Sequence, residues 1–160
     1  EGDGAVREYD GKSGKVVWAM RSTWKWQHQP TALDNGHILL LDNKGGRPQS
    51  GRSRVIEFNP VTGERIWAYT GTPANRFFTN TCGSCQRLSN GNTLITESDT
   101  GYVFEVDESG RTVWKFANPV LIGDKRDAIW RMTRFSSGDL PFLPVSQTMR
   151  GGTVSVPASP

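Results

Sequence analysis

The residues of this 160-residue chain that are best suited to chemistry are two histidines and two cysteines. An imidazole ring can take up or release a proton near neutral pH, and its N–H can bind an anionic oxygen. His28 lies beside Trp24 and Trp26, where it either caps backbone groups in a loop or belongs to a site. His37 directly follows an Asn-Gly turn, and we interpret it as a turn residue rather than a ligand.

The two cysteines, Cys82 and Cys85, have the Cys-x-x-Cys spacing. A zinc site would need two more ligands, and the chain has no other cysteine. A thiol redox motif normally opens a helix, and nothing around this segment has a helical pattern. Two interpretations stay open, a local disulfide of an exported protein or two unpaired thiols. The sequence also lacks a calcium loop, a phosphate-binding glycine loop and a nucleophile elbow, so we predict neither a metal nor a cofactor.

An internal repeat organises the strands that position these residues. The stretch Phe58–Trp67 has the pattern of a strand end, a tight turn and a new strand that reaches a tryptophan. It has counterparts at Tyr9–Trp18 and Val106–Trp114, and the three closing tryptophans are 49 and 47 residues apart. A constant period in this range indicates a repeat architecture.

Two residue types recur at equivalent places in the three copies. A tryptophan closes each copy, and a glutamate precedes each turn. The tryptophans are Trp18, Trp67 and Trp114, and the glutamates are Glu8, Glu57 and Glu105. We interpret the tryptophans as packing residues between neighbouring units. Three carboxylates at equivalent positions favour a structural partner, such as an arginine or a backbone amide, over acid–base catalysis.

The repeat carries the signals of about four short antiparallel strands per unit. Asn35-Gly36 and Asn90-Gly91 are strong hairpin signals, because a type I′ turn needs positive φ at both central residues. The continuous apolar run over residues 38–41 predicts a strand that is buried on both faces. Residues 24–30 are predicted as a connection, and residues 129–135 as one more alternating strand.

Four antiparallel strands form one blade of a β-propeller, and a single blade cannot bury its faces alone. We therefore predict an all-β fold, with a partial β-propeller over residues 1–150 and an irregular tail over residues 151–160. A closed ring needs at least four blades, so the remaining blades would come from outside this chain or from another subunit. A two-sheet sandwich with a chance repeat is the alternative, because it uses the same strand and turn signals.

Composition narrows the functional classes. The net charge of +3 is slight and dispersed, which argues against a nucleic-acid partner but suits a small acidic substrate. No apolar run approaches the length that crosses a bilayer. The chain starts at Glu1 without a methionine and reaches its first turn at Asp10, so we expect that residue 1 is not a biological start.

Three stretches resemble the bacterial arylsulfotransferase family, namely Gln27–Asn43, Ser53–Phe58 and Leu88–Ser98. The resemblance extends from about residue 5 to residue 135, where Trp130–Phe135 is similar to the end of the family pattern. It implies the C-terminal half of a six-bladed propeller that is periplasmic or extracellular. It also implies transfer of a sulfuryl group from an aryl sulfate to a phenol acceptor, without a diffusible cofactor.

The same resemblance implies two site residues. His28 falls on the family's Gln-His position and is the implied catalytic residue, and Arg47 falls on the arginine that binds the sulfuryl oxygens. A guanidinium suits that task because its paired donors match an oxyanion. The family's nucleophilic histidine is missing, since residues 92–100 contain no histidine. The alternative is therefore a non-catalytic propeller that serves as a binding or scaffold module.

Overall fold

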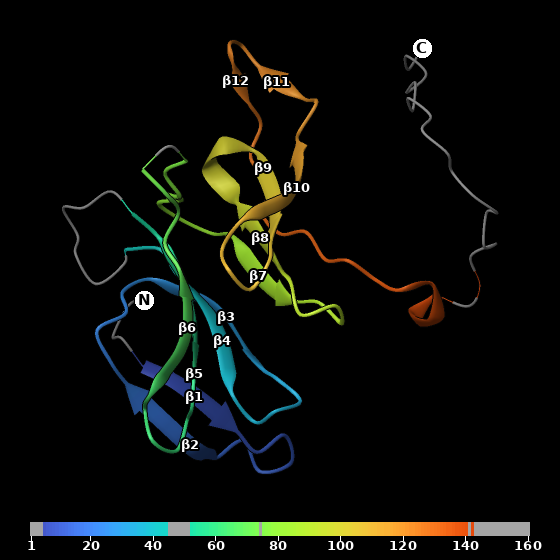
Figure 1. Cartoon of the computed structure of the whole chain (residues 1–160). Helices are drawn as coiled ribbons and strands as arrows, with labels where there is room; N and C mark the ends of the chain where they lie inside the picture. The colour runs from blue at the N-terminus through green and yellow to red at the C-terminus, as the bar shows by residue number, and fades with distance from the viewer. Residues whose placement is uncertain (1–4, 45–51, 74, 141, 143–160) are drawn as a thin grey trace.

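The computed structural model describes residues 5–44, 52–73, 75–140 and 142, and most of its regular elements are strands (Figure 1). Two four-stranded antiparallel sheets form its centre. The first sheet contains β3 (Gln27–Ala32), β4 (Ile38–Asp42), β5 (Arg54–Phe58) and β6 (Arg65–Tyr69). The second sheet contains β7 (Ser84–Arg87), β8 (Thr93–Glu97), β9 (Tyr102–Val106) and β10 (Thr112–Ala117). The prediction of an all-β fold built from four-stranded units is confirmed.

Two smaller strand pairs and two short 3₁₀ helices accompany these sheets. The pairs are β1 (Ala5–Tyr9) with β2 (Val16–Arg21), and β11 (Leu121–Ile122) with β12 (Lys125–Arg126). The 3₁₀ helices are η1 (Ser98–Thr100) and η2 (Ser137–Asp139). Within the described residues, no helix is long and apolar enough to span a membrane. The tail predicted over residues 151–160 lies outside the described residues.

The three copies of the sequence repeat have strand pairs with an equivalent register. In three strand pairs a repeated glutamate lies directly opposite a repeated tryptophan, and the register shifts next to it. These opposing residues are Glu8 and Trp18, Glu57 and Trp67, and Glu105 and Trp114. The β1–β2 pair therefore corresponds to β5–β6 and to β9–β10, which are the later halves of the two sheets. Among the described strands, β1 pairs only with β2.

Strand β4 is buried on both faces, as its continuous apolar run predicts. Leu39 and Leu41 pack in one core, together with residues of the second sheet such as Ile95. Leu40 belongs to the opposite core, which includes Val6 of β1. All three leucines are fully buried, so the first sheet is covered on both of its faces.

The predicted connection over residues 24–30 is wrong in its second half, where β3 already begins. The pairing of β3 with β4 shifts between His28 and Thr31, which is a β-bulge. The bulge accommodates Pro30, whose ring nitrogen has no N–H to donate to a sheet ladder. Strand β3 is also at the edge of the first sheet, where a proline is tolerated.

The prediction of a regular strand over residues 129–135 is wrong, because side chains instead of a strand ladder hold this segment to the second sheet. The side chain of Gln86 accepts a hydrogen bond from the backbone N–H of Arg134 and donates one to its carbonyl, both at 2.9 Å. The hydroxyl of Thr96 accepts from the N–H of Met132 at 3.1 Å. These side chains satisfy backbone groups that a neighbouring strand would otherwise satisfy.

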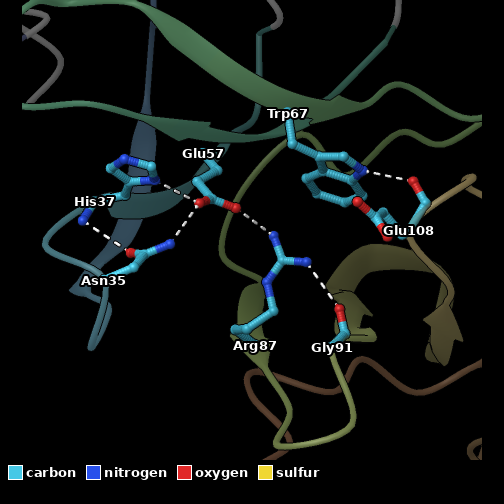
Figure 2. A network of polar contacts seen from close by, with 7 residues as sticks. All are labelled: Asn35, His37, Glu57, Trp67, Arg87, Gly91 and Glu108. Atoms are coloured by element: carbon cyan, nitrogen blue, oxygen red, sulfur yellow. Dashed lines mark hydrogen bonds and ion pairs between the residues drawn. The ribbon is translucent and has the colours of Figure 1, made fainter.

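A charged clamp joins the first and second sheets (Figure 2). The buried Glu57 carboxylate of β5 accepts hydrogen bonds from Arg87 of β7 at 2.6 Å and from His37 at 2.8 Å. The guanidinium carbon of Arg87 lies 4.9 Å from the centre of the Trp67 ring. The indole N–H of Trp67 in turn donates to the Glu108 carbonyl at 2.9 Å. His37, which was interpreted as a turn residue, therefore belongs to this clamp.

The clamp recurs between the second sheet and the segment that follows it. Glu105 forms an ion pair with Arg134, whose guanidinium lies 4.9 Å from the centre of the Trp114 ring. Asn92 takes the place that His37 has in the first clamp and donates to Glu105 at 2.6 Å. The expectation that the repeated glutamates have structural partners is confirmed for both clamps.

Both clamps favour an ionised glutamate. Burial acts to raise the pKa of Glu57, but the hydrogen bonds from His37 and Asn35 and the charge of Arg87 outweigh burial, and the pKa lies below its ordinary value of 4.5. In the second clamp, hydrogen bonding chiefly from asparagine also lowers the pKa of the glutamate. Folding is therefore coupled to the ionisation of these carboxyl groups.

The first copy of the repeat lacks this clamp. Glu8 is exposed and has no hydrogen-bond or ion-pair partner among the described residues. Ala32 holds the position on β3 that Arg87 holds on β7, since Ala32 lies opposite Ile38 and Arg87 lies opposite Thr93. An alanine at this place offers nothing to the glutamate or to the neighbouring tryptophan.

We predict that Ala32→Arg installs a third clamp beside Glu8 and Trp18. An exposed ion pair and a cation–π contact together contribute about 0.5–2 kcal/mol, so the free energy of unfolding from urea denaturation should rise by about that amount. The same substitution in a Glu8→Gln background is the matched control and should lose most of the gain. An equal gain in both backgrounds would contradict the assignment.

We predict that Glu57→Gln lowers the free energy of unfolding by about 1–3 kcal/mol at neutral pH, because Arg87 and His37 lose a charged acceptor. Folding lowers the pKa of Glu57, so its contribution is complete above pH 4.5 and is lost as the pH falls through the folded-state value. The difference from the wild type should therefore shrink in acid, in urea denaturation at a series of pH values. Glu64→Gln, in an exposed turn, is the control and should change stability little. A difference that stays constant to low pH would rule out this role for Glu57.

Candidate functional site

His28 lies on β3, at the other end of the first sheet from the Asn-Gly turn. It pairs with Leu41 of β4, and its ring is partly exposed. The Nδ1 atom lies 2.9 Å from the carbonyl oxygen of Trp26 and 2.7 Å from Oδ1 of Asn43. A backbone carbonyl can only accept a hydrogen bond, so Nδ1 carries a proton and donates it.

The second ring nitrogen of His28, Nε2, has no hydrogen-bond partner among the described residues. With Nδ1 protonated, Nε2 holds a lone pair in the neutral ring and a second proton in the charged ring. The ring can therefore accept a proton at Nε2 or release one there. This is the property that a general acid–base residue requires.

The backbone around His28 is held in an uncommon conformation. Trp26 and Gln29 flank it with φ angles of 61° and 47°, and nearby Cys82 has a φ of 53°. Among the described residues, these are the only non-glycine residues with positive φ. Each such residue costs about 1–2 kcal/mol, and strain of this kind concentrates at functional sites. The Oε1 atom of Gln29 is also buried without a hydrogen-bond partner in the described part of the chain.

Asn43 links His28 to the second sheet. Its side chain is fully buried, and Nδ2 donates to the carbonyls of Thr79 and Cys82, both at 2.9 Å. The buried hydroxyl of Ser53 reinforces this junction, because it contacts the carbonyls of Asn43 at 2.9 Å and Thr79 at 3.1 Å and accepts from the Thr79 N–H at 3.0 Å. The segment before β7 is thus fixed against the end of β4.

Gly83 allows this close approach. Its φ is 92°, and a Cβ atom there would lie 2.7 Å from Cδ2 of Leu41 and 2.8 Å from the carbonyl oxygen of Thr96. Any larger side chain would push the segment away from β4. The glycine therefore keeps the Cys82 carbonyl within reach of Asn43.

Charged groups near this end of the first sheet are mostly paired. Arg54 donates through Nε to the buried Asp42 carboxylate at 2.8 Å. The Lys44 ammonium donates to the side chain of Asn80 and lies 5.8 Å from the centre of the Trp26 ring. Arg47, the predicted sulfuryl-binding residue, lies outside the described residues, so its role stays a prediction.

Cys82 and Cys85 are both free in the structure, with Cys82 partly exposed and Cys85 buried, and their pairing in a local disulfide stays a prediction. Cys85 is buried in the core, and burial raises its pKa to about 12. A thiol in that state is a poor nucleophile and metal ligand, because both roles need the thiolate. Cys82 contributes its backbone carbonyl to the Asn43 junction.

An open cleft of about 960 Å³ lies between the two sheets. Gln29 and Thr31 of β3, Arg87 of β7 and Arg131 contribute to its wall. The wall also includes Asn35 and Gly91 of the two Asn-Gly turns, at the other end of the sheets from His28, and His28 is not among the lining residues. A volume of this size can hold a small aromatic molecule.

Sequence reasoning placed His28 at a site but missed Asn43, Ser53 and Thr79. The available signal was the polar pair Asp42-Asn43 at the end of a fully buried strand. Polar residues in such a place need buried partners, and the two carbonyls to which Asn43 donates lie 36 and 39 residues away in the sequence.

Comparison with known proteins gives a family match. The family described as Arylsulfotransferase (ASST) matches residues 5–119, which include His28, Asn43 and Arg47. Among solved structures, the chain is similar to a crystal structure of a protein of unknown function from Bacteroides caccae, with 14% sequence identity and a TM-score of 0.33. That alignment covers 66% of this chain and 52% of the other, so the chain spans about half the length of that protein. No curated protein matches the chain.

Proposed function

Because this chain belongs to the arylsulfotransferase family, we propose that it supplies His28 to a site that transfers a sulfuryl group from an aryl sulfate to a phenol acceptor. The observation that supports this role is the pair of acceptors on Nδ1, Trp26 and Asn43, which leaves Nε2 for proton transfer. The left-handed residues on either side of His28 support the same location.

In the proposed reaction, the bond between sulfur and the donor oxygen breaks, and a bond between sulfur and the acceptor oxygen forms. The leaving phenoxide gains a proton and the acceptor phenol loses one, so the transfer is balanced without a cofactor. Nε2 of His28 protonates the leaving phenoxide and later takes the proton of the acceptor. This sequence fits a two-step transfer in which a nucleophile outside this chain holds the sulfuryl group in between.

The transferred group carries negative charge on its oxygens, so cationic donors should surround it. We propose Arg47 for this task, because it follows Asn43 closely in the chain and a guanidinium can donate two parallel hydrogen bonds. The proposed substrates are accordingly an aryl sulfate and a phenol.

We further propose that other blades, or another subunit, complete the ring around this site. The pairing of β1 supports this, because its counterparts β5 and β9 are paired along both edges whereas β1 has one partner among the described strands. In the two complete sheets the corresponding position beside β5 and β9 is filled by β4 and β8, so one more strand beside β1 would complete its unit. A periplasmic or extracellular location follows from the family resemblance alone.

The second candidate function is a non-catalytic propeller that binds or scaffolds. It is favoured by one observation, namely that the chain has no spare histidine to act as the nucleophile. Of its two histidines, His37 already donates to the Glu57 carboxylate. An intact protein that folds but does not turn over aryl sulfates would support this candidate.

We predict that His28→Gln lowers turnover of a chromogenic aryl sulfate with a phenol acceptor by about 10²–10⁴-fold in the intact protein, because proton transfer at Nε2 is lost. The matched control is His37→Asn, which reproduces the asparagine that the second clamp has at this place and should leave turnover unchanged. Unchanged turnover in His28→Gln would exclude His28 from the chemistry.

We predict that Arg47→Ala raises the KM for the aryl sulfate by about 10–100-fold, because a charge-assisted hydrogen bond contributes about 1.5–3 kcal/mol. Steady-state kinetics of the intact protein measure this change. Arg52→Ala is the matched control, since Arg52 is an exposed arginine close by in the chain. Equal effects of the two substitutions would show that Arg47 has no specific role.

A further inference from the structure

We infer that Asn43 is a positioning residue, which fixes the proton of the neutral His28 ring on Nδ1 and thereby keeps Nε2 available. The use of Nε2 in sulfuryl transfer rests on the proposed function. The position of the proton does not, because it follows from the hydrogen bonds around the two side chains.

The orientation of the Asn43 amide is determined by two backbone carbonyls. Nδ2 has two hydrogens, and both have acceptors at 2.9 Å, the carbonyl oxygens of Thr79 and Cys82. A flipped amide would place Oδ1 against these two oxygens, with no hydrogen between them. Because the side chain of Asn43 is fully buried, no solvent could relieve that repulsion. Oδ1 must therefore face His28.

This orientation determines the tautomer of His28. Oδ1 of Asn43 has no hydrogen, so the short contact of 2.7 Å to Nδ1 is a hydrogen bond only if the ring nitrogen donates. The contact of Nδ1 with the Trp26 carbonyl, at 2.9 Å, requires the same. A ring with its single proton on Nε2 would direct its lone pair at two oxygen atoms. Because Nδ1 donates a hydrogen bond, Nε2 of the neutral ring carries the lone pair.

The position of the proton also depends on how the two sheets pack. Thr79 and Cys82 lie between the sheets in the chain, in the segment that leads into β7, and Gly83 lets that segment approach β4. Ser53 holds Thr79 in place from the start of β5. The position of Asn43, and with it the hydrogen bond from Nδ1 of His28, therefore depends on how the two sheets pack. A loss of this packing would release the ring even if His28 itself were unchanged.

The experiment is a long-range ¹H–¹⁵N correlation spectrum of the imidazole rings in the intact protein. The spectrum distinguishes a protonated ring nitrogen from an unprotonated one. The His28→Gln variant assigns the signals of His28, and the His37→Asn variant assigns those of His37. We expect the neutral His28 ring of the wild type to carry its proton on Nδ1. A proton on Nε2 would overturn the inference, and this measurement needs no substitution at Asn43.

Two substitutions test whether Asn43 is the cause. Asn43→Ala removes the acceptor, and we expect a mixture of the two His28 tautomers and turnover lower by about 10–100-fold. Asn43→Asp keeps an acceptor oxygen toward Nδ1 but sets its second oxygen against the Thr79 and Cys82 carbonyls, so we expect the Nδ1–H tautomer to persist and the free energy of unfolding to fall. The His37 signals are the internal control, because their partner Glu57 lies in the clamp, and they should stay constant in both variants. An unchanged His28 spectrum in Asn43→Ala would contradict the positioning role.

The two proposals can fail separately. A wild-type ring with the proton on Nδ1, together with full activity of His28→Gln, would leave the inference about Asn43 standing and overturn the proposed function. An inactive His28→Gln variant with the wild-type proton on Nε2 would do the reverse.

Discussion

A sheet of four short strands has two faces to cover and cannot bury both of them alone. This constraint explains why Leu39, Leu40 and Leu41 are all apolar, because alternate residues of β4 enter different cores on the two sides of the sheet. Each sheet is stable only against its neighbours. The polar groups that carry specific roles accordingly lie at the junctions between sheets, where side chains from distant parts of the sequence meet.

Each junction between sheets has two ends, one beside the Asn-Gly turns and one beside His28, and different interactions hold the two ends together. At the turn end, each ionised glutamate pairs with an arginine of the adjoining unit, and that arginine also lies over the tryptophan of the glutamate's own sheet. A buried charge is expensive to leave unpaired, so these clamps resist separation of the sheets. At the opposite end, the chain adopts left-handed conformations around His28, and a buried amide satisfies carbonyls of the next segment. Rigid clamps at one end can hold a strained arrangement at the other.

Local signals predicted much of the fold. The hairpin at Asn35-Gly36 and the apolar run that follows depend on neighbouring residues only, and both were identified correctly. The turn type was not, because Gly36 has a positive φ but Asn35 does not, so the turn is not of type I′. The repeat indicated that Glu57 has a structural partner, but Arg87 could not be named, because that pairing depends on how two sheets pack. The start of β3 was missed because a proline such as Pro30 argues against a strand, although a bulged edge strand tolerates one.

The candidate site was predictable only in part. Resemblance to a family identified His28, whereas Asn43 looked like an ordinary loop residue. Its importance arises from contacts with Thr79 and Cys82, which no short-range pattern connects to it. The partner of a buried polar group can be anywhere in the sequence, so it becomes visible only when the chain is folded.

A crystal structure of the intact protein with a bound arylmethanesulfonate, in which CH₂ replaces the bridging oxygen of an aryl sulfate, would examine the contact on which the proposed function depends. Nε2 of His28 should lie within hydrogen-bonding reach of the sulfonate group, or beside the CH₂ that stands for the leaving oxygen, at about 2.6–3.2 Å or one water away. A compound bound with its sulfonate group beyond that reach of His28 would contradict the account.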